Sequence, residues 1–397
     1  MENIKTRIAQ LSSEYFQEIR EIRRHIHQNP ELSTEEYMTA EYICKKLDEY
    51  GISYRKNVAG TGVVGLIEGK NPSGRNIAIR ADMDALPIIE QNNVDYKSLI
   101  HGKMHACGHD VHMACLLGTA RILDRLTDQF SGSVKLIFQP SEETYPGGAI
   151  KMIHEGVLKN PDTASVIGQH VTNEIDAGKI GVRSGIYMAS TDEVFLTVKG
   201  KGGHAATPDQ VIDPILIASH IIVAIQQIVS RNANPIVPTV VSFGKISGEG
   251  RTNIIPDEVL VAGTIRTFDE SWRTKIHEKI AKLSSSIAEG MGGRCETRIS
   301  HGYPALINDH QLTAKIKSWA IDYLGENNVL DLEKRMTAED FAYFAQEVPS
   351  SFFRLGTRSE KKGMISNLHT STFDIDETSI MTGMGFMAYA AVRYLSD

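Results

Sequence analysis

Apolar side chains recur at helical spacing in the first fifty residues. Two helices are predicted there, and the first ends near Gln28, ahead of Asn29-Pro30. In the second helix, apolar residues recur every three or four positions, at Tyr37, Ala40, Ile43, Cys44 and Leu47. Ser33 followed by Glu36 matches a capping box and predicts that this helix begins just after residue 33.

Between residues 63 and 170, short apolar runs alternate with helical segments. The predicted strands cover 63–68, 76–81, 134–139 and 164–170, and the predicted helices cover 111–128 and 150–155. This alternation is typical of an α/β sheet with helices packed against it.

The pattern changes near residue 185. A strand, a helix, two strands, a second helix and a strand are expected in that order, with helices after Pro214 and over 271–291, and strands that include 194–199, 239–246 and 259–267. This order indicates a compact α+β insert over residues 186–300. After residue 303 the α/β style returns, with a strand over 352–356 and a final helix over 379–395. The prediction is therefore a discontinuous domain, 1–185 and 301–397, interrupted by 186–300.

Length, charge and cysteine content narrow the class of protein. The chain has 397 residues, enough for two domains, and its 42 basic and 49 acidic residues give a net charge of −7, so we expect neither nucleic acid nor an anionic membrane as a partner. The N-terminus lacks the apolar core of a signal peptide, and the longest apolar run, 215–229, is interrupted by polar residues. Four scattered cysteines fit a reducing cytoplasm, where we expect the protein to reside.

Residues 104–112 concentrate metal-binding side chains. Three histidines, a cysteine and an aspartate occur in the sequence Met104-His105-Ala106-Cys107-Gly108-His109-Asp110-Val111-His112. Thiolate and imidazole suit zinc and neighbouring divalent metals, and carboxylate extends the choice to manganese. The alternative is a polar loop with a buried cysteine and a helix-capping aspartate.

Other ligand-type residues follow predicted strands. Asp82 and Asp84 come after one strand, Glu142 and Glu143 after another, and His170 after a third. Sites in α/β proteins form at the carboxyl ends of strands, although acidic residues also occur there as ordinary turn residues. Where two carboxylates are adjacent, one can bind metal while the other transfers protons.

Further polar candidates lie outside this group. The glycine-rich turn before Ala205 carries His204, and Arg251, Asn253 and Arg266 are polar candidates of the insert. A buried arginine fork suits a carboxylate, whereas a surface arginine is the commoner case. The basic cluster Arg23, Arg24, His25 and His27 is interpreted as a solvated helix face, with His25 or His27 near the site as the alternative.

Taken together, these motifs resemble a known family. They are Asp82-Met83-Asp84-Ala85-Leu86-Pro87, Met104-His105-Ala106-Cys107-Gly108-His109-Asp110, Gln139-Pro140-Ser141-Glu142-Glu143, Asn253-Ile254-Ile255-Pro256-Asp257 and Leu368-His369. In this order they look like the amidohydrolase branch of the aminoacylase/carboxypeptidase metallopeptidases, which includes hippurate hydrolases, N-acetyl-amino-acid deacetylases and plant auxin-conjugate hydrolases. The resemblance implies an α/β, zinc-peptidase-like catalytic domain with a mixed central sheet. A smaller α+β, ferredoxin-like lid domain would interrupt the catalytic domain, and the protein would form a homodimer through this lid domain.

The resemblance also implies roles for residues of the catalytic domain. Two divalent ions (manganese, zinc, nickel or cobalt) would be held by Cys107, His109, Glu143, His170 and His369. Glu142 would be the general base and Asp84 would orient a ligand. Asp82 stands where other branches of the family carry a metal-binding histidine.

For the lid domain, the resemblance implies that His204 polarises the scissile carbonyl, reaching across from the dimer partner. Asn253 and Arg266 would receive the substrate carboxylate. The residues after His170 are Val171-Thr172-Asn173, where the family pattern has a proline nearby, which indicates a local change in pocket shape.

The expected activity is hydrolysis of the amide bond in N-acyl amino acids such as hippurate or N-acetyl conjugates. A metal-dependent exopeptidase with the same site and a different pocket is the alternative. A catalytically inactive binding protein is disfavoured, because such a protein would be expected to lack Glu142 or one of the ligands, and all are present.

Overall fold

The computed structural model describes residues 4–72 and 74–396, and the chain divides into two compact units. The first comprises Met1–Gly185, Ile307–Glu333 and Asp340–Asp397, and the second comprises Ile186–Leu306 and Lys334–Glu339. The chain passes from the first unit to the second within β7 (Gly185–Met188) and returns within β14 (Leu306–Asn308). It enters the second unit once more for the short stretch Lys334–Glu339.

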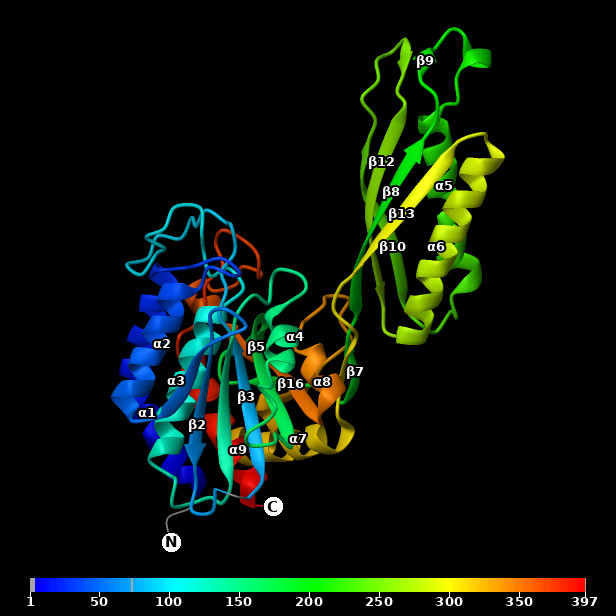
Figure 1. The fold of residues 1–397 in the computed structure, drawn as a ribbon. Helices are drawn as coiled ribbons and strands as arrows, with labels where there is room; N and C mark the ends of the chain where they lie inside the picture. The colour runs from blue at the N-terminus through cyan, green and yellow to red at the C-terminus, as the bar shows by residue number, and fades with distance from the viewer. Residues whose placement is uncertain (1–3, 73, 397) are drawn as a thin grey trace. The chain divides into compact units, whose positions relative to one another are not determined.

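In its described residues, the first unit contains an eight-stranded mixed sheet with the order β1-β2-β4-β3-β5-β16-β6-β15 (Figure 1). The strands are β1 (Ser53–Val58), β2 (Gly62–Glu68), β3 (Asn76–Asp82), β4 (Ser133–Gln139), β5 (Ser165–Asp176), β6 (Ile180–Val182), β15 (Val329–Asp331) and β16 (Ser350–Arg358). Strands β3, β4, β5 and β16 are parallel, whereas β1 and β2 are antiparallel to their neighbours. Every residue of β3 and β4 is buried, as expected of central strands covered on both faces. The predicted α/β fold with a mixed central sheet is confirmed.

Helices lie on both faces of this sheet. Ile79 of β3 belongs to the hydrophobic core that includes α3 (His109–Asp124) and α9 (Ser379–Ser396). The guanidinium of its neighbour Arg80 lies 6.0 Å from the ring of Phe341, just before α8 (Ala342–Glu347). Since successive strand residues point to opposite faces, α3 and α9 lie on one face and α8 on the other.

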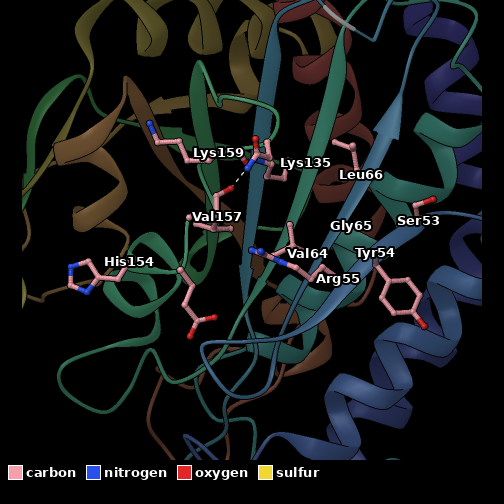
Figure 2. Close-up of a pocket in the computed structure, with 13 residues that line it drawn as sticks. Ser53, Tyr54, Arg55, Val64, Gly65, Leu66, Lys135, His154, Val157 and Lys159 are labelled. Carbon is pink, nitrogen blue, oxygen red and sulfur yellow. Dashed lines mark hydrogen bonds between the residues drawn. The ribbon is translucent and has the colours of Figure 1, made fainter.

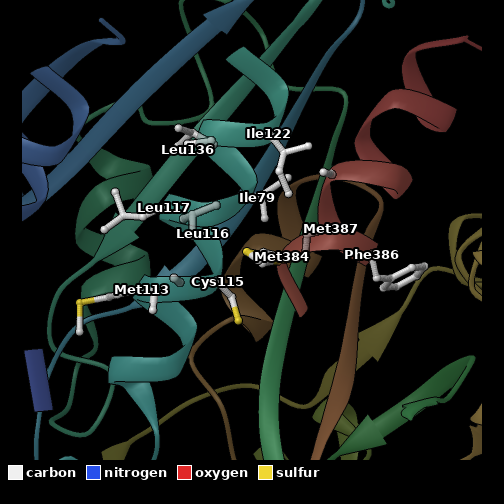
Figure 3. Packing of buried hydrophobic residues seen from close by; sticks show 14 of the residues in the cluster. Ile79, Met113, Cys115, Leu116, Leu117, Ile122, Leu136, Met384, Phe386 and Met387 are labelled. Atoms are coloured by element: carbon white, nitrogen blue, oxygen red, sulfur yellow. The ribbon is translucent and has the colours of Figure 1, made fainter. Parts of the chain in front are cut away.

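The remaining helices of the first unit are α1 (Ile4–Gln28), α2 (Tyr37–Tyr50), α4 (Gly148–His154) and α7 (His310–Leu324). The core between α3 and α9 includes Cys115, Leu116 and Met384 (Figure 3). Gly383 permits this close packing, because a Cβ atom there would lie 2.7 Å from Sγ of Cys115. Helix α3, whose first residue is the metal-ligand candidate His109, is thus fixed along nearly its whole length.

The capping box predicted at Ser33 and Glu36 is wrong. Helix α2 begins at Tyr37, and the carboxylate of Glu31 accepts hydrogen bonds from the Met38 and Thr39 amides. Ser33 donates instead to Oδ2 of Asp84 at 2.6 Å, and Glu36 accepts from the amide of Ser141 at 2.8 Å. Both side chains point toward strand ends and not toward the helix they precede.

In its described residues, the second unit contains a four-stranded antiparallel sheet with the order β10-β12-β8-β13. Its strands are β8 (Ser190–Lys199), β10 (Thr239–Ser247), β12 (Glu258–Thr267) and β13 (Arg294–His301), and its helices are α5 (Pro214–Gln227) and α6 (Glu270–Gly290). The two helices pack against each other and against the sheet (Figure 1). A short ribbon pairs β9 (Gly203–His204) with β11 (Ile254–Ile255).

One helical stretch of the described residues, Pro214–Asn232, is long and apolar enough to cross a membrane by length and composition. It consists of α5 and the helical turn Ile228–Asn232 that follows it. Length and composition alone are weak evidence, because core helices of globular domains pass the same test. Ile217, Ile221 and Ile225 of this helix pack into the core of the second unit.

Candidate metal centre and active site

The register of the parallel strands brings the predicted site residues to one edge of the sheet. Asp82 at the end of β3 pairs with Gln139 at the end of β4, and Arg80 pairs with Gly168 of β5. His170 therefore lies level with Asp82. The segments that carry the other candidates follow directly from these strand ends, as expected for an α/β site.

The first group of metal-ligand candidates is Cys107, His109 and His170, whose ligand atoms lie within 4.8 Å of one another. All three residues are buried, and Sγ of Cys107 lies 3.4 Å from Nε2 of His170. Gly108 makes the turn between Cys107 and His109 with a φ of 81°, and a Cβ there would lie 2.4 Å from the Val171 side chain. Only glycine satisfies both conditions.

Backbone carbonyls fix the orientation of two of these imidazoles. Nδ1 of His109 lies 2.8 Å from the carbonyl oxygen of Asp84, and Nδ1 of His170 lies 2.8 Å from that of Val171. A carbonyl can only accept, so each Nδ1 carries a proton and each Nε2 is the ring nitrogen that faces the group and would bind a cation. This is the arrangement by which proteins orient metal-binding histidines.

The second group shares the same sulfur and consists of Cys107, Glu143 and His369. Nε2 of His369 lies 3.3 Å from Sγ of Cys107 and 3.4 Å from Oε1 of Glu143. The amide of His369 donates to the carbonyl of Ala106 at 2.8 Å, and its φ of 62° is the left-handed conformation that non-glycine residues rarely adopt. Such conformations concentrate at functional sites.

Asp84 positions the two glutamates after β4. Its carboxylate accepts from the amides of Glu142 at 3.0 Å and Glu143 at 2.9 Å, in addition to the Ser33 hydroxyl. Burial alone would raise the pKa of Asp84, but hydrogen bonding and the charge of His109 hold that pKa below its ordinary value. Asp84 therefore stays ionised and fixes the backbone from which Glu142 and Glu143 project. His109, Glu142 and Glu143 form a third group of possible ligands.

These donor groups fit divalent cations. Nε2 of His109 and Oε1 of Glu143 are buried without a hydrogen-bond partner among the described residues, 3.9 Å apart. Burial lowers the pKa of His109, but the carboxylates of Asp82 and Asp84 outweigh it and raise that pKa to about 10. Burial first, and then Glu143 and Glu142, raise the pKa of the Cys107 thiol well above its ordinary value. Both shifts report an excess of buried carboxylate charge, and a cation held by these unpartnered atoms would neutralise it.

Asp82 and His112 have other partners. Oδ1 of Asp82 lies 2.5 Å from Nδ1 of His112, and Oδ2 accepts from Arg80 at 2.7 Å. Nε2 of His112 accepts from the amide of Val171 at 2.9 Å, so both of its nitrogens are used. The aspartate thus supports β5 through His112, and Arg80 supplies its counter-charge.

The interpretation of Arg23 and His27 as a solvated face is wrong, because both side chains are fully buried. Nε of Arg23 donates to Oδ2 of Asp110 at 2.7 Å, and Nδ1 of His27 lies 2.8 Å from the same oxygen. The helical spacing of α1 already contained this information. Ile19, Arg23 and His27 follow one another at intervals of four residues on the buried face of the helix, and a buried face includes every position on it.

The polar candidates of the second unit are split between two places. His204 pairs with Ile254 in the β9–β11 ribbon, and the amide of Ala205 donates to the carbonyl of Asn253, so His204 and Asn253 lie together. Arg266 lies at the far end of β12, paired with Thr191. The eight residue-to-residue steps from Glu258 to Arg266 span about 26 Å at the usual rise of a strand.

A cavity of about 640 Å³ lies away from these groups, over β1, β2 and β4 (Figure 2). Lys135 lines it, but its Nζ is already bonded to the carbonyls of Val157, Lys159 and Pro161 and to the hydroxyl of Thr163. Burial, and then the charge of Arg55, lower the pKa of Lys135 to about 8. The cavity contains none of the candidate ligands.

Known proteins resemble this chain over nearly its whole length. The model of Peptidase family M20/M25/M40 matches residues 78–393. Thermostable carboxypeptidase 2 of Saccharolobus solfataricus is 40% identical over 377 residues, which cover 94% of each chain. N-acetyl-L-cysteine deacetylase of Bacillus subtilis is 40% identical over 376 residues, which cover 95% of this chain and 88% of that protein.

Solved structures agree with these relatives. The crystal structure of the Bacillus subtilis YXEP protein, a dinuclear metal-binding peptidase from the M20 family, superposes with a TM-score of 0.84 and 33% identity. The match covers 97% of this chain and 99% of that one. The fold is therefore that of a metallopeptidase family. The chain belongs to peptidase family M20/M25/M40, and the family resemblance seen in its sequence is confirmed.

Replacing Asp84 by Asn should destabilise the protein by about 1–3 kcal/mol, because the amide nitrogen would face a backbone N–H of Glu142 or Glu143. Urea denaturation at neutral pH measures this. The pKa of Asp84 is lowered in the folded protein. The ionised carboxylate therefore contributes to stability at neutral pH, and this contribution is lost as the pH falls below about 4.

The difference in the free energy of unfolding between wild type and the Asp84→Asn variant should therefore become smaller in acid. Ser33→Ala, which removes one neutral donor to the same carboxylate, is the matched control and should cost less. Equal stability of Asp84→Asn and wild type at neutral pH would contradict the role given to Asp84.

Proposed function

We propose that this protein is a metal-dependent hydrolase that cleaves the amide bond of N-acyl amino acids to a carboxylic acid and a free amino acid. The observation that carries the proposal is the pair of ligand groups that share Sγ of Cys107, with unused buried donor atoms on His109 and Glu143. Cys107, His109, Glu143, His170 and His369 would hold two divalent cations. The mixed sulfur, nitrogen and oxygen donors accept manganese, zinc, nickel or cobalt.

When bound, such a pair of cations acidifies a water molecule and polarises the carbonyl of the substrate. Glu142 takes a proton from the attacking water on its carboxylate, and the water oxygen bonds to the carbonyl carbon. As the carbon–nitrogen bond breaks, Glu142 returns that proton to the amine nitrogen. Glu142 suits this role because Asp84 holds its amide and 7% of the residue is exposed, which leaves it little bulk water.

His204 would donate a hydrogen bond to the carbonyl oxygen as charge develops there. Its Nδ1 accepts from the amide of Ala206 at 3.0 Å, so the neutral ring carries its proton on Nε2, and the side chain is exposed. Arg266 and Asn253 would bind the substrate carboxylate. Arg266 lies near one end of β12, and Asn253 lies beyond the other end, beside the β9–β11 ribbon, so a small substrate contacts both only if a second copy of the chain supplies one of them.

A homodimer through the second unit meets this requirement. The second unit exposes Ile215, Leu216 and Val223 on α5 and Ile246 on the edge strand β10. Exposed apolar residues beside an unpaired strand edge favour association with another chain. The pairing of His204 with Asn253 on one ribbon indicates that the second copy supplies both.

The names of the relatives are consistent with two substrate classes for this protein. The deacetylase of Bacillus subtilis is named for an N-acetyl amino acid, and the protein of Saccharolobus solfataricus for a carboxypeptidase activity. An exopeptidase acting on dipeptides is therefore the second candidate. Both would use the same cations and base.

The deciding experiment is hydrolysis of a panel of N-acetyl amino acids, hippurate and dipeptides, with chelator or with added manganese or zinc. We expect chelator-sensitive release of free amino acid from one acyl class. Turnover of dipeptides alone would establish the exopeptidase. No turnover with any metal would contradict the proposed function.

Replacing Glu142 by Gln should lower kcat by about 10²–10⁴-fold, the usual contribution of a general acid–base, while the protein still binds its cations. The matched control is Glu143→Gln, which should weaken cation binding itself. Steady-state kinetics and metal content of the purified variants measure both. Full activity of Glu142→Gln would exclude it as the base.

Co-expression of the Glu142→Gln and His204→Ala chains tests whether His204 acts across a dimer. If it does, each mixed dimer contains one complete site, and random assembly should recover about a quarter of wild-type activity. If His204 acts within its own chain, no site is complete and activity stays at the level of the separate variants.

A further inference from the structure

We propose that Arg23 is a positioning residue that fastens the segment carrying His369 to the helix that begins at His109. This inference rests on the proposed function, because it assumes that His369 binds a cation. It assigns a role in the metal centre to a residue of α1, more than eighty positions away in the sequence from any candidate ligand.

His369 needs such support because regular structure does not hold it. It lies in the segment between the 3₁₀ turn Glu360–Lys362 and α9, whereas His109 opens α3 and His170 lies within β5. Its side chain is 54% exposed, so packing contributes little to its position. Its left-handed backbone conformation also requires external restraint.

Arg23 supplies a restraint that reaches both sides of the site. Its Nε donates to Oδ2 of Asp110 at 2.7 Å, and Asp110 directly follows His109. Its Nη2 donates to Oδ1 of Asp374 at 3.0 Å, five residues beyond His369. A guanidinium can bridge two carboxylates in this way because its donors diverge in a fixed plane.

The bridge is enclosed. Arg23 is 0% exposed, and Asp110 and Asp374 are also buried. Tyr96 donates to the other oxygen of Asp374 at 2.7 Å, and Asn173, three residues after His170, donates to the Asp374 backbone carbonyl at 2.9 Å. Without Arg23, the buried carboxylates of Asp110 and Asp374 would lose their shared counter-charge, and the ion-pair link between the His369 segment and α3 would be lost.

The neighbouring arginine provides a matched control. Arg24 lies on the same helix and also bonds to the C-terminal segment, through Glu377 at 2.6 and 2.9 Å. No bond joins Arg24 to Asp110 or Asp374 among the described contacts, and its side chain is 28% exposed. If any ion pair to this segment sufficed, Arg24→Met would behave like Arg23→Met.

The test is titration of zinc into the metal-free full-length protein against a competing chromophoric chelator. We expect two zinc ions to bind wild type, and Arg23→Met to weaken one of them by about 10–100-fold, the usual effect of losing a residue that orients a ligand. Arg24→Met should bind both as wild type does. Asp374→Asn keeps the shape of the side chain that Arg23 bonds to but removes its negative charge. It should therefore also weaken the binding of one zinc ion, by less than Arg23→Met does.

A double-mutant cycle separates positioning from general stabilisation. In a His369→Ala background, Arg23→Met should cause no further loss of zinc affinity, because Arg23 acts through His369. An additive loss would overturn the proposal, as would wild-type affinity in both Arg23→Met and Asp374→Asn. If Arg23→Met does not fold, Asp374→Asn decides alone. Failure of wild type to bind a pair of zinc ions would contradict the proposed function instead.

Discussion

Buried negative charge is the constraint on which the site depends. Several carboxylates, among them Asp82, Asp84, Glu142 and Glu143, meet the thiol of Cys107 at one sheet edge, where the protein interior stabilises ions poorly. The protein neutralises Asp82 with Arg80 and His112, and it satisfies Asp84 with backbone amides and Ser33. Among the described residues, Glu143 and Cys107 receive no comparable compensation, so charge balance and the unpartnered donor atoms together favour this place for the proposed cations.

Much of the fold and part of the site were predictable because they follow from local pattern. Continuous apolar runs marked β3, β4 and β5, and parallel pairing then requires their carboxyl ends to meet. This single geometric rule brought Asp84, Glu142 and His170 together from positions far apart in the chain. Gly108 gave the turn between two ligand candidates. The family motifs added His369, which no strand end marked.

What the sequence pattern missed depends on tertiary partners. Arg23 and His27 looked solvated because charged residues usually are, but partners from distant parts of the chain allow their burial. Asp110, brought in by the packing of α1 on α3, bonds to both, and Asp374 bonds to Arg23. Ser33 and Glu36 had the spacing of a capping box, but they bond instead to Asp84 and Ser141, which follow the ends of β3 and β4. The separation of Asn253 from Arg266 likewise required the register of β12, since sequence distance does not reveal the two ends of one sheet.

The sharing of Sγ of Cys107 between two ligand groups has a consequence for resistance to oxidants. Sulfur is the one donor atom of the site that oxidises readily, and sulfinic acid forms irreversibly in most proteins. Because both groups use this atom, a single oxidation would remove a donor from each at once. The burial of Cys107, with 5% exposed, would therefore shield both groups of candidate ligands and not one group alone.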